Sequence, residues 1–127
     1  MDVFLINAKN ENRLDFIKEL SQNLSKEKSV LILSFKRNKD KNIEDLFDMA
    51  GMITYDICDY FLNIAGLEKI IVKNDENLDF AISPLLEEKY EVKEEDIKKL
   101  LKNLNSYDYI VIDSLDKSLL NNQKEIN

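Results

Sequence analysis

The segment Tyr107-Asp108-Tyr109-Ile110-Val111-Ile112-Asp113-Ser114 decides the fold of this chain. Its centre is continuously apolar and rich in β-branched side chains, which is typical of a strand buried on both faces of a sheet. Such strands occur in parallel sheets that helices cover on both sides, so the segment predicts an α/β protein. The strand ends in the carboxylate of Asp113.

Two earlier segments have the same apolar character. Residues 3–7 and residues 29–35 are apolar runs that predict two more buried strands. Between them, residues 14–24 place leucine and isoleucine at three- and four-residue steps, which predicts a helix. Strand, helix and strand in this order predict a right-handed crossover and therefore a parallel sheet.

The middle of the chain predicts shorter elements. We expect a short helix that begins after Asn42 and ends at Gly51, and a second helix from about Asp56 to Ile64 with Gly66 as its stop. A strand is expected over residues 78–82, where polar residues precede an apolar run.

The last third of the chain contains the most regular helix pattern. Residues 94–104 combine an acidic first turn with lysines toward the carboxyl end, and both features are favourable with the helix dipole. Residues 115–127 form a polar, poorly defined tail. Strands that alternate with helices over residues 1–127 predict a single three-layer α/β domain with a mainly parallel sheet.

Composition excludes several functional classes. The chain has 18 basic and 25 acidic residues and a net charge of −7, so its field repels nucleic acid and anionic lipid, and we expect neither as a partner. It has no histidine, and Cys58 is its one cysteine, which excludes the common nucleophile pairs, an internal disulfide and the usual zinc sets. No stretch approaches the ~20 apolar residues of a membrane span, so we expect a soluble cytoplasmic protein.

Ligands of open parallel sheets bind beyond the carboxyl ends of the strands. At this edge the chain places Lys9 after the first predicted strand and Asp113 at the end of the last. An amine for phosphate charge and a carboxylate for magnesium or its water are what a phosphate-and-magnesium site requires. The ordinary alternative is that both residues are polar strand ends that face water.

The order and spacing of the segments resemble the MinD/ParA class of P-loop ATPases, which position bacterial division, flagellar and plasmid machinery. Residues 3–9 are similar to that family's first strand and signature lysine, and residues 107–114 are similar to its Walker B segment. Residues 28–33, 55–61 and 78–84 are similar to segments between these two. The resemblance covers nearly the whole chain and implies a P-loop NTPase-like fold, either as a fragment or in a shortened form.

The phosphate loop departs from the family pattern. That pattern reads K-G-G-x-G-K-[ST], whereas Lys9 is followed by Asn10-Glu11-Asn12-Arg13-Leu14-Asp15, with no glycine. Glycines are needed there because the backbone turns with unusual dihedrals and places its N–H groups against phosphate oxygens. Glu11 adds negative charge where phosphates would lie.

Three side chains of the family site are also replaced. Leu14 stands at the position of the second lysine, or Arg13 does if the loop is one residue shorter, and Asp15 or Leu14 replaces the magnesium-binding Ser/Thr. Ser34 stands where the family has an Asp after its second strand. Of the family's ATPase residues, only Lys9 and Asp113 remain.

These losses predict a non-catalytic pseudo-ATPase domain that acts in protein–protein interaction or in positioning or regulating a bacterial assembly. Loss of one positioned charge donor commonly costs ~10²-fold in rate, and several donors change together here. We therefore expect no catalytic residues, no metal, no cofactor, and a protein partner or self-association, with a homodimer as one form.

Two other functions are compatible with the sequence. In the first, a nucleotide-binding switch uses a non-standard loop for ATP with magnesium, with Lys9 and Arg13 on the phosphates and Asp113 on the metal. In the second, a receiver-like phosphoacceptor domain requires clustered carboxylates at the sheet edge, where Asp113 alone is placed. The basic segment 36–41 is interpreted as a solvated loop, with an acidic partner or a phosphate as the alternative.

Overall fold

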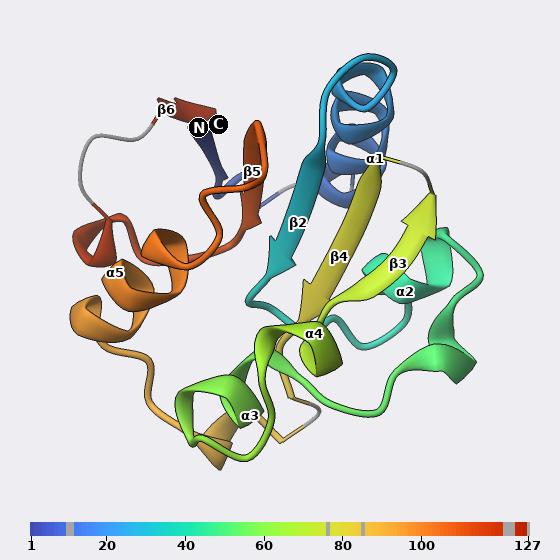
Figure 1. The fold of residues 1–127 in the computed structure, drawn as a ribbon. Helices are drawn as coiled ribbons and strands as arrows, with labels where there is room; N and C mark the ends of the chain where they lie inside the picture. The colour runs from blue at the N-terminus through green and yellow to red at the C-terminus, as the bar shows by residue number, and fades with distance from the viewer. Residues whose placement is uncertain (10–11, 76, 85, 121–123, 127) are drawn as a thin grey trace.

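A central six-stranded sheet organises the chain (Figure 1). The computed structural model describes residues 1–9, 12–75, 77–84, 86–120 and 124–126. The sheet order is β3-β4-β2-β5-β1-β6, and every neighbouring pair is parallel except β3 and β4. The strands are β1 (Asp2–Ile6), β2 (Val30–Ser34), β3 (Val72–Asp75), β4 (Leu78–Ile82), β5 (Tyr109–Asp113) and β6 (Lys124–Ile126). The predicted mainly parallel α/β sheet is confirmed.

Helices cover both faces of this sheet. Helix α1 (Arg13–Leu24) and helix α2 (Ile43–Leu46) pack on one face. The other face is covered by α3 (Ile57–Phe61), α4 (Leu67–Ile70) and α5 (Glu94–Lys102). Short 3₁₀ helices span Ala50–Met52, Glu87–Lys89 and Lys117–Leu119. Among the described residues, no helix is long and apolar enough to cross a membrane.

The period-two geometry of the strands divides the core into two layers. Along β5, Ile110 and Ile112 contribute to the cluster under α3, α4 and α5, whereas Val111 contributes to the cluster under α1 and α2. All five residues of β2 are buried, because this strand lies inside the sheet with helices on both faces. The continuous apolar runs in the sequence follow from this arrangement.

Two predicted helix ends are wrong, and both errors have the same cause. Helix α2 ends at Leu46 rather than near Gly51, and α3 ends at Phe61 rather than near Gly66. The chain leaves each helix through a non-glycine residue in the left-handed region, Asp48 with φ 54° and Asn63 with φ 60°.

The hydrogen bonds at both ends form the Schellman pattern. After α3, the Asn63 N–H donates to the Tyr60 carbonyl at 3.1 Å and the Ile64 N–H donates to the Asp59 carbonyl at 2.8 Å. Consequently Ile64, the predicted last residue of this helix, lies beyond its end and is 59% exposed. Gly66 instead precedes α4 as its N-terminal flanking residue.

The carboxyl-terminal segment contains structure that the sequence pattern does not indicate. Leu115 and Leu120 are buried in the core on either side of the 3₁₀ helix Lys117–Leu119. Strand β6 pairs in parallel with β1 at the edge of the sheet. The rest of the predicted tail, residues 121–123 and 127, lies outside the described part of the chain.

Candidate functional site

The carboxyl ends of β1, β2 and β5 meet at one edge of the sheet and place Asp113 at its centre. In the strand register, Asp113 is the partner of Ile6 in β1 and of Ser34 in β2. Its side chain is fully buried. The polar side chains that reach it therefore decide what its carboxylate is able to do.

Both oxygens of the Asp113 carboxylate are engaged. The Ser34 hydroxyl donates to Oδ2 at 2.8 Å, and the Ser114 hydroxyl donates to Oδ1 at 2.8 Å. Ser114 has φ 61°, so the backbone turns sharply directly after β5. The sequence placed Ser34 at a family carboxylate position, and the structure shows that its hydroxyl now contacts Asp113.

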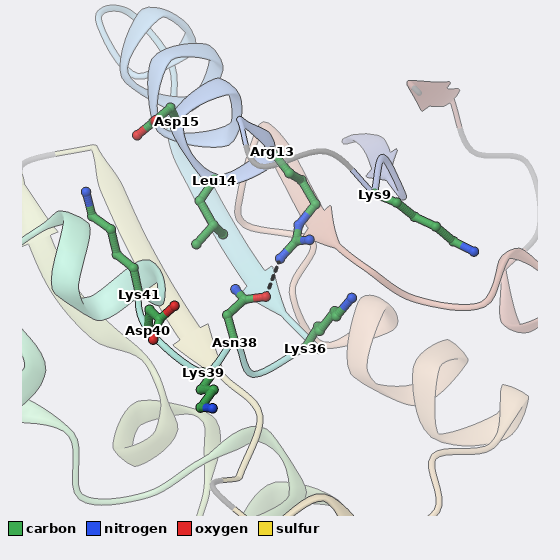
Figure 2. Close-up of a pocket in the computed structure, with 9 residues that line it drawn as sticks. All are labelled: Lys9, Arg13, Leu14, Asp15, Lys36, Asn38, Lys39, Asp40 and Lys41. Atoms are coloured by element: carbon green, nitrogen blue, oxygen red, sulfur yellow. Dashed lines mark hydrogen bonds between the residues drawn. The ribbon is translucent and has the colours of Figure 1, made fainter.

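Arg13 forms an ion pair with the same carboxylate. Its Nε atom lies 2.7 Å from Oδ1 of Asp113, and the Arg13 side chain is only 6% exposed. One terminal nitrogen of the guanidinium donates to Oδ1 of Asn38 at 3.2 Å (Figure 2). Arg13 is the first residue of α1, so its side chain connects this helix, the end of β5 and the loop after β2.

Lys9, the third predicted site residue, is exposed and lies apart from this cluster. In Figure 2 its side chain extends away from Arg13 and Asn38. Thus two of the three predicted side chains, Arg13 and Asp113, are brought together. They bind each other, whereas the nucleotide-binding alternative requires Arg13 on a phosphate and Asp113 on a metal ion. Asn10 and Glu11, on which the expected loss of the phosphate cradle partly depends, lie outside the described residues.

A cavity of about 340 Å³ opens in front of Arg13. It lies between the start of α1 and the loop after β2, and Figure 2 shows Arg13 of α1 reaching toward Asn38 of that loop. Its lining residues are Lys9, Arg13, Leu14, Asp15, Lys36, Asn38, Lys39, Asp40 and Lys41. The predicted strand–helix–strand unit places both segments at the carboxyl edge of the sheet, but it does not show that residues 36–41 face the start of α1.

The loop after β2 is fixed by its own polar contacts. The Arg37 guanidinium binds the Glu44 carboxylate with two hydrogen bonds, of 3.0 and 2.5 Å. The Asn38 backbone N–H donates to the Asn42 side chain at 2.7 Å, and the Asn42 amide donates back to the Asn38 carbonyl at 3.1 Å. These contacts hold the basic segment in one conformation beside the cavity.

A second polar cluster lies beyond the end of β4, outside the predicted site. Lys89 Nζ lies 3.0 Å from an Asp56 oxygen and 2.6 Å from an Asp59 oxygen. Burial alone would raise the pKa of Asp59, but hydrogen bonds from Lys89 and from the Asp56 backbone outweigh it and lower that pKa. Burial, and next the Asp56 carboxylate, raise the pKa of the adjacent Cys58 thiol to about 11.

Solved structures with the same architecture belong to bacterial division and plasmid-partition proteins. The MinD chain of the MinC:MinD cell division complex of Aquifex aeolicus is similar with a TM-score of 0.72 and 23% identity, over 90% of this chain and 47% of that one. A plasmid partition protein from Borrelia burgdorferi gives 0.73 and 25%, over 88% and 55%. A putative plasmid partition protein from Borrelia burgdorferi B31, solved with AMPPNP bound, gives 0.71 and 24%, over 89% and 53%.

No protein-family model matches the chain, and no curated protein matches it. The chain spans about half the length of the solved proteins to which it is similar. Over that length, the strands and helices described above have the arrangement of the MinD/ParA-like P-loop fold.

Proposed function

We propose that this chain is a pseudo-ATPase domain that has the MinD/ParA-like fold and acts by binding a protein partner. The observation that carries the proposal is the buried ion pair between Arg13 and Asp113. Asp113 occupies the place of the family's Walker B carboxylate, so a cation already neutralises the group that the family uses toward magnesium. The hydroxyls of Ser34 and Ser114 engage its oxygens further.

The described residues do not fit magnesium with a nucleotide. Magnesium demands near-ideal octahedral oxygen geometry and dehydrates reluctantly, whereas the Asp113 carboxylate is fully buried behind Arg13. Releasing it would leave the Arg13 guanidinium buried without its counter-charge, at a cost of about 3–5 kcal/mol. Leu14 offers no cation to a phosphate, and the segment from Lys9 to Asp15 contains no glycine.

The protein-interaction part of the proposal rests on the fold and on one relative. MinD of Aquifex aeolicus, which is similar over 90% of this chain, is solved in complex with MinC. We extend this property of that relative, the binding of a protein partner, to the present chain as part of the proposal. Fold analogy of this kind motivates the proposal, and the nucleotide measurement below tests it.

Isothermal titration of the chain with ATP and magnesium tests the pseudo-ATPase assignment. We expect no heat of binding up to millimolar nucleotide. Binding with a micromolar Kd would overturn the assignment. Titration with ADP and with AMPPNP under the same conditions extends the test to the product and to a non-hydrolysable triphosphate.

The alternative is a nucleotide-binding switch, and two observations favour it over other functions. The cavity beside Arg13 carries several lysines, and a similar plasmid partition protein is solved with AMPPNP bound. This alternative predicts a nucleotide-induced rise in melting temperature that disappears in Lys9→Ala and Asp113→Asn. The pseudo-ATPase proposal predicts no rise in the unsubstituted protein or in either variant.

A further inference from the structure

We propose that the cavity in front of Arg13 binds an extended acidic segment of a protein partner, with Lys36, Lys39 and Lys41 as its main cationic contacts. The inference rests on the proposed function, which it deepens by naming the chemistry of the partner. It replaces the interpretation of residues 36–41 as a merely solvated loop.

Charge is the first argument. The cavity is lined by five cationic side chains and two carboxylates, in a chain whose net charge is −7. Lys9, Lys36, Lys39 and Lys41 are exposed, and none forms an ion pair with any residue that the structure describes. Unneutralised lysines along one rim create a local positive potential that attracts an acidic ligand against the average charge of the protein.

The neighbouring arginines behave differently. Arg13 is paired with Asp113 and Arg37 is paired with Glu44, and all four of these side chains are largely buried. Both arginines therefore serve the internal structure of this edge. Lys36, Lys39 and Lys41 of the same loop are exposed to solvent, and their amines are therefore accessible to a ligand.

The directions of the lysines indicate an extended ligand rather than a single anion. In Figure 2, Lys36, Lys39 and Lys41 extend from the loop after β2, and Lys9 extends away from Arg13 and Asn38. The four side chains point in different directions, so their amines do not converge on one point. A compact phosphate group would require convergent donors. An extended chain with several carboxylates places its negative charges along a line, so it suits cations that are distributed along a rim rather than gathered at one point.

The site is also organised before any ligand arrives. The bidentate Arg37–Glu44 pair and the reciprocal hydrogen bonds between Asn38 and Asn42 fix the backbone that carries the lysines. Binding then requires ordering of lysine side chains but no reorganisation of the loop, which lowers the entropic cost of association.

The test uses a fluorescein-labelled hexaglutamate peptide and the full chain, followed by fluorescence anisotropy at low salt. We expect saturable binding that weakens as salt rises, and no binding of the hexaglutamine peptide. The triple variant Lys36→Gln, Lys39→Gln and Lys41→Gln should weaken binding by at least about tenfold. The matched control changes three exposed lysines elsewhere to glutamine, Lys26, Lys99 and Lys102, and should change binding by less than about threefold.

Several outcomes would overturn the inference. Equal losses in the two triple variants would show attraction by the whole surface rather than by this cavity. Tighter binding of an oligothymidine than of hexaglutamate at the same lysines would assign the cavity to nucleic acid. Failure of the peptide to bind, with no binding of ATP, would refute this inference and leave the pseudo-ATPase proposal intact, whereas micromolar ATP binding would refute the latter.

Discussion

The Arg13 guanidinium and the Asp113 carboxylate form a buried ion pair that joins the first residue of α1 to the last residue of β5, with Nε 2.7 Å from Oδ1. Removing two charges from water costs several kcal/mol each, and their attraction repays this only when further hydrogen bonds satisfy the remaining lone pairs. Ser34 and Ser114 supply those bonds to the carboxylate, and Asn38 accepts one from the guanidinium. Arg13, Asp113, Ser34, Ser114 and Asn38 thus form one polar network at the carboxyl edge of the sheet.

Arg13→Met should lower the free energy of unfolding by about 3–5 kcal/mol, because it leaves the Asp113 charge buried and unpaired. Urea denaturation followed by circular dichroism measures this loss. The double variant Arg13→Met with Asp113→Asn should recover part of it, because the uncompensated charge is removed.

Lys98→Met is the control for the loss of a cation. Lys98 pairs with Glu94 at 3.7 Å on the exposed side of α5. Such surface pairs contribute at most about 1 kcal/mol, so this variant should be close to the unsubstituted protein. Equal destabilisation by Arg13→Met and Lys98→Met would contradict the structural role assigned to the buried pair.

The strands could be predicted from sequence because their signal is local. Burial of β2 and β5 on both faces requires nothing more than consecutive apolar residues, and residues 30–34 and 109–113 show this directly. The helix ends could not be predicted in the same way. Gly51 and Gly66 looked like stop signals, but Asp48 and Asn63 adopt the left-handed conformation, which these two residue types tolerate better than most.

Asp48→Gly and Asn63→Gly should each raise the free energy of unfolding by up to about 1 kcal/mol. Glycine removes the steric cost of a positive φ, which exceeds the extra entropy it adds to the unfolded chain. Thermal denaturation measures the change. Asn103→Gly is the comparison, since Asn103 follows α5 with φ −87° and donates a side-chain hydrogen bond to Tyr60. It should lower stability, because glycine relieves no strain there and the hydrogen bond is lost. A loss of stability in all three variants would contradict the argument.

The position of the candidate site at the edge of the sheet could be predicted from the sequence, but the contacts among its side chains could not. Parallel strands end at one edge, so Asp113 and Ser34 had to lie near each other once the strands were assigned. The contact of Arg13 with Asp113 depends on how α1 starts after the loop, and the sequence is equally consistent with Arg13 facing a phosphate. Asn38 and the basic segment could be placed beside α1 only by the tertiary fold.

Cys58 should react very slowly with Ellman's reagent in the folded protein. With a pKa of about 11, only about 0.1% of the thiol is ionised near pH 8, and the side chain is 4% exposed. The thiolate is the reactive form, so the rate should rise about tenfold per unit of pH between about pH 8 and 10. In denaturing urea the same thiol should react at least about a hundredfold faster. Rapid stoichiometric labelling of the folded chain at neutral pH would contradict this assignment.

Ser34→Asp should destabilise the protein, although it restores the residue type found at this position in the MinD/ParA class. The Ser34 hydroxyl donates to the buried Asp113 carboxylate at 2.8 Å. Arg13 is the cation paired with Asp113, so the carboxylate introduced at position 34 would have to share it. A second carboxylate there would meet a like charge in low dielectric, which raises the pKa of the introduced group. We expect a loss of about 3 kcal/mol near pH 7.

The pH dependence separates this repulsion from the loss of a hydrogen bond. An introduced carboxyl whose folded pKa lies above its unfolded value of about 3.9 binds more protons in the folded state, so its penalty is small in acid and grows as pH rises through the folded pKa. Ser34→Ala removes only the hydroxyl and should cost about 1–2 kcal/mol with little dependence on pH. Urea titrations of both variants between about pH 4 and 8 measure the difference. If the two variants were equally stable at neutral pH, the carboxylate of Asp113 would have to be free to move away from the end of β2, and the closed network around Arg13 would be wrong.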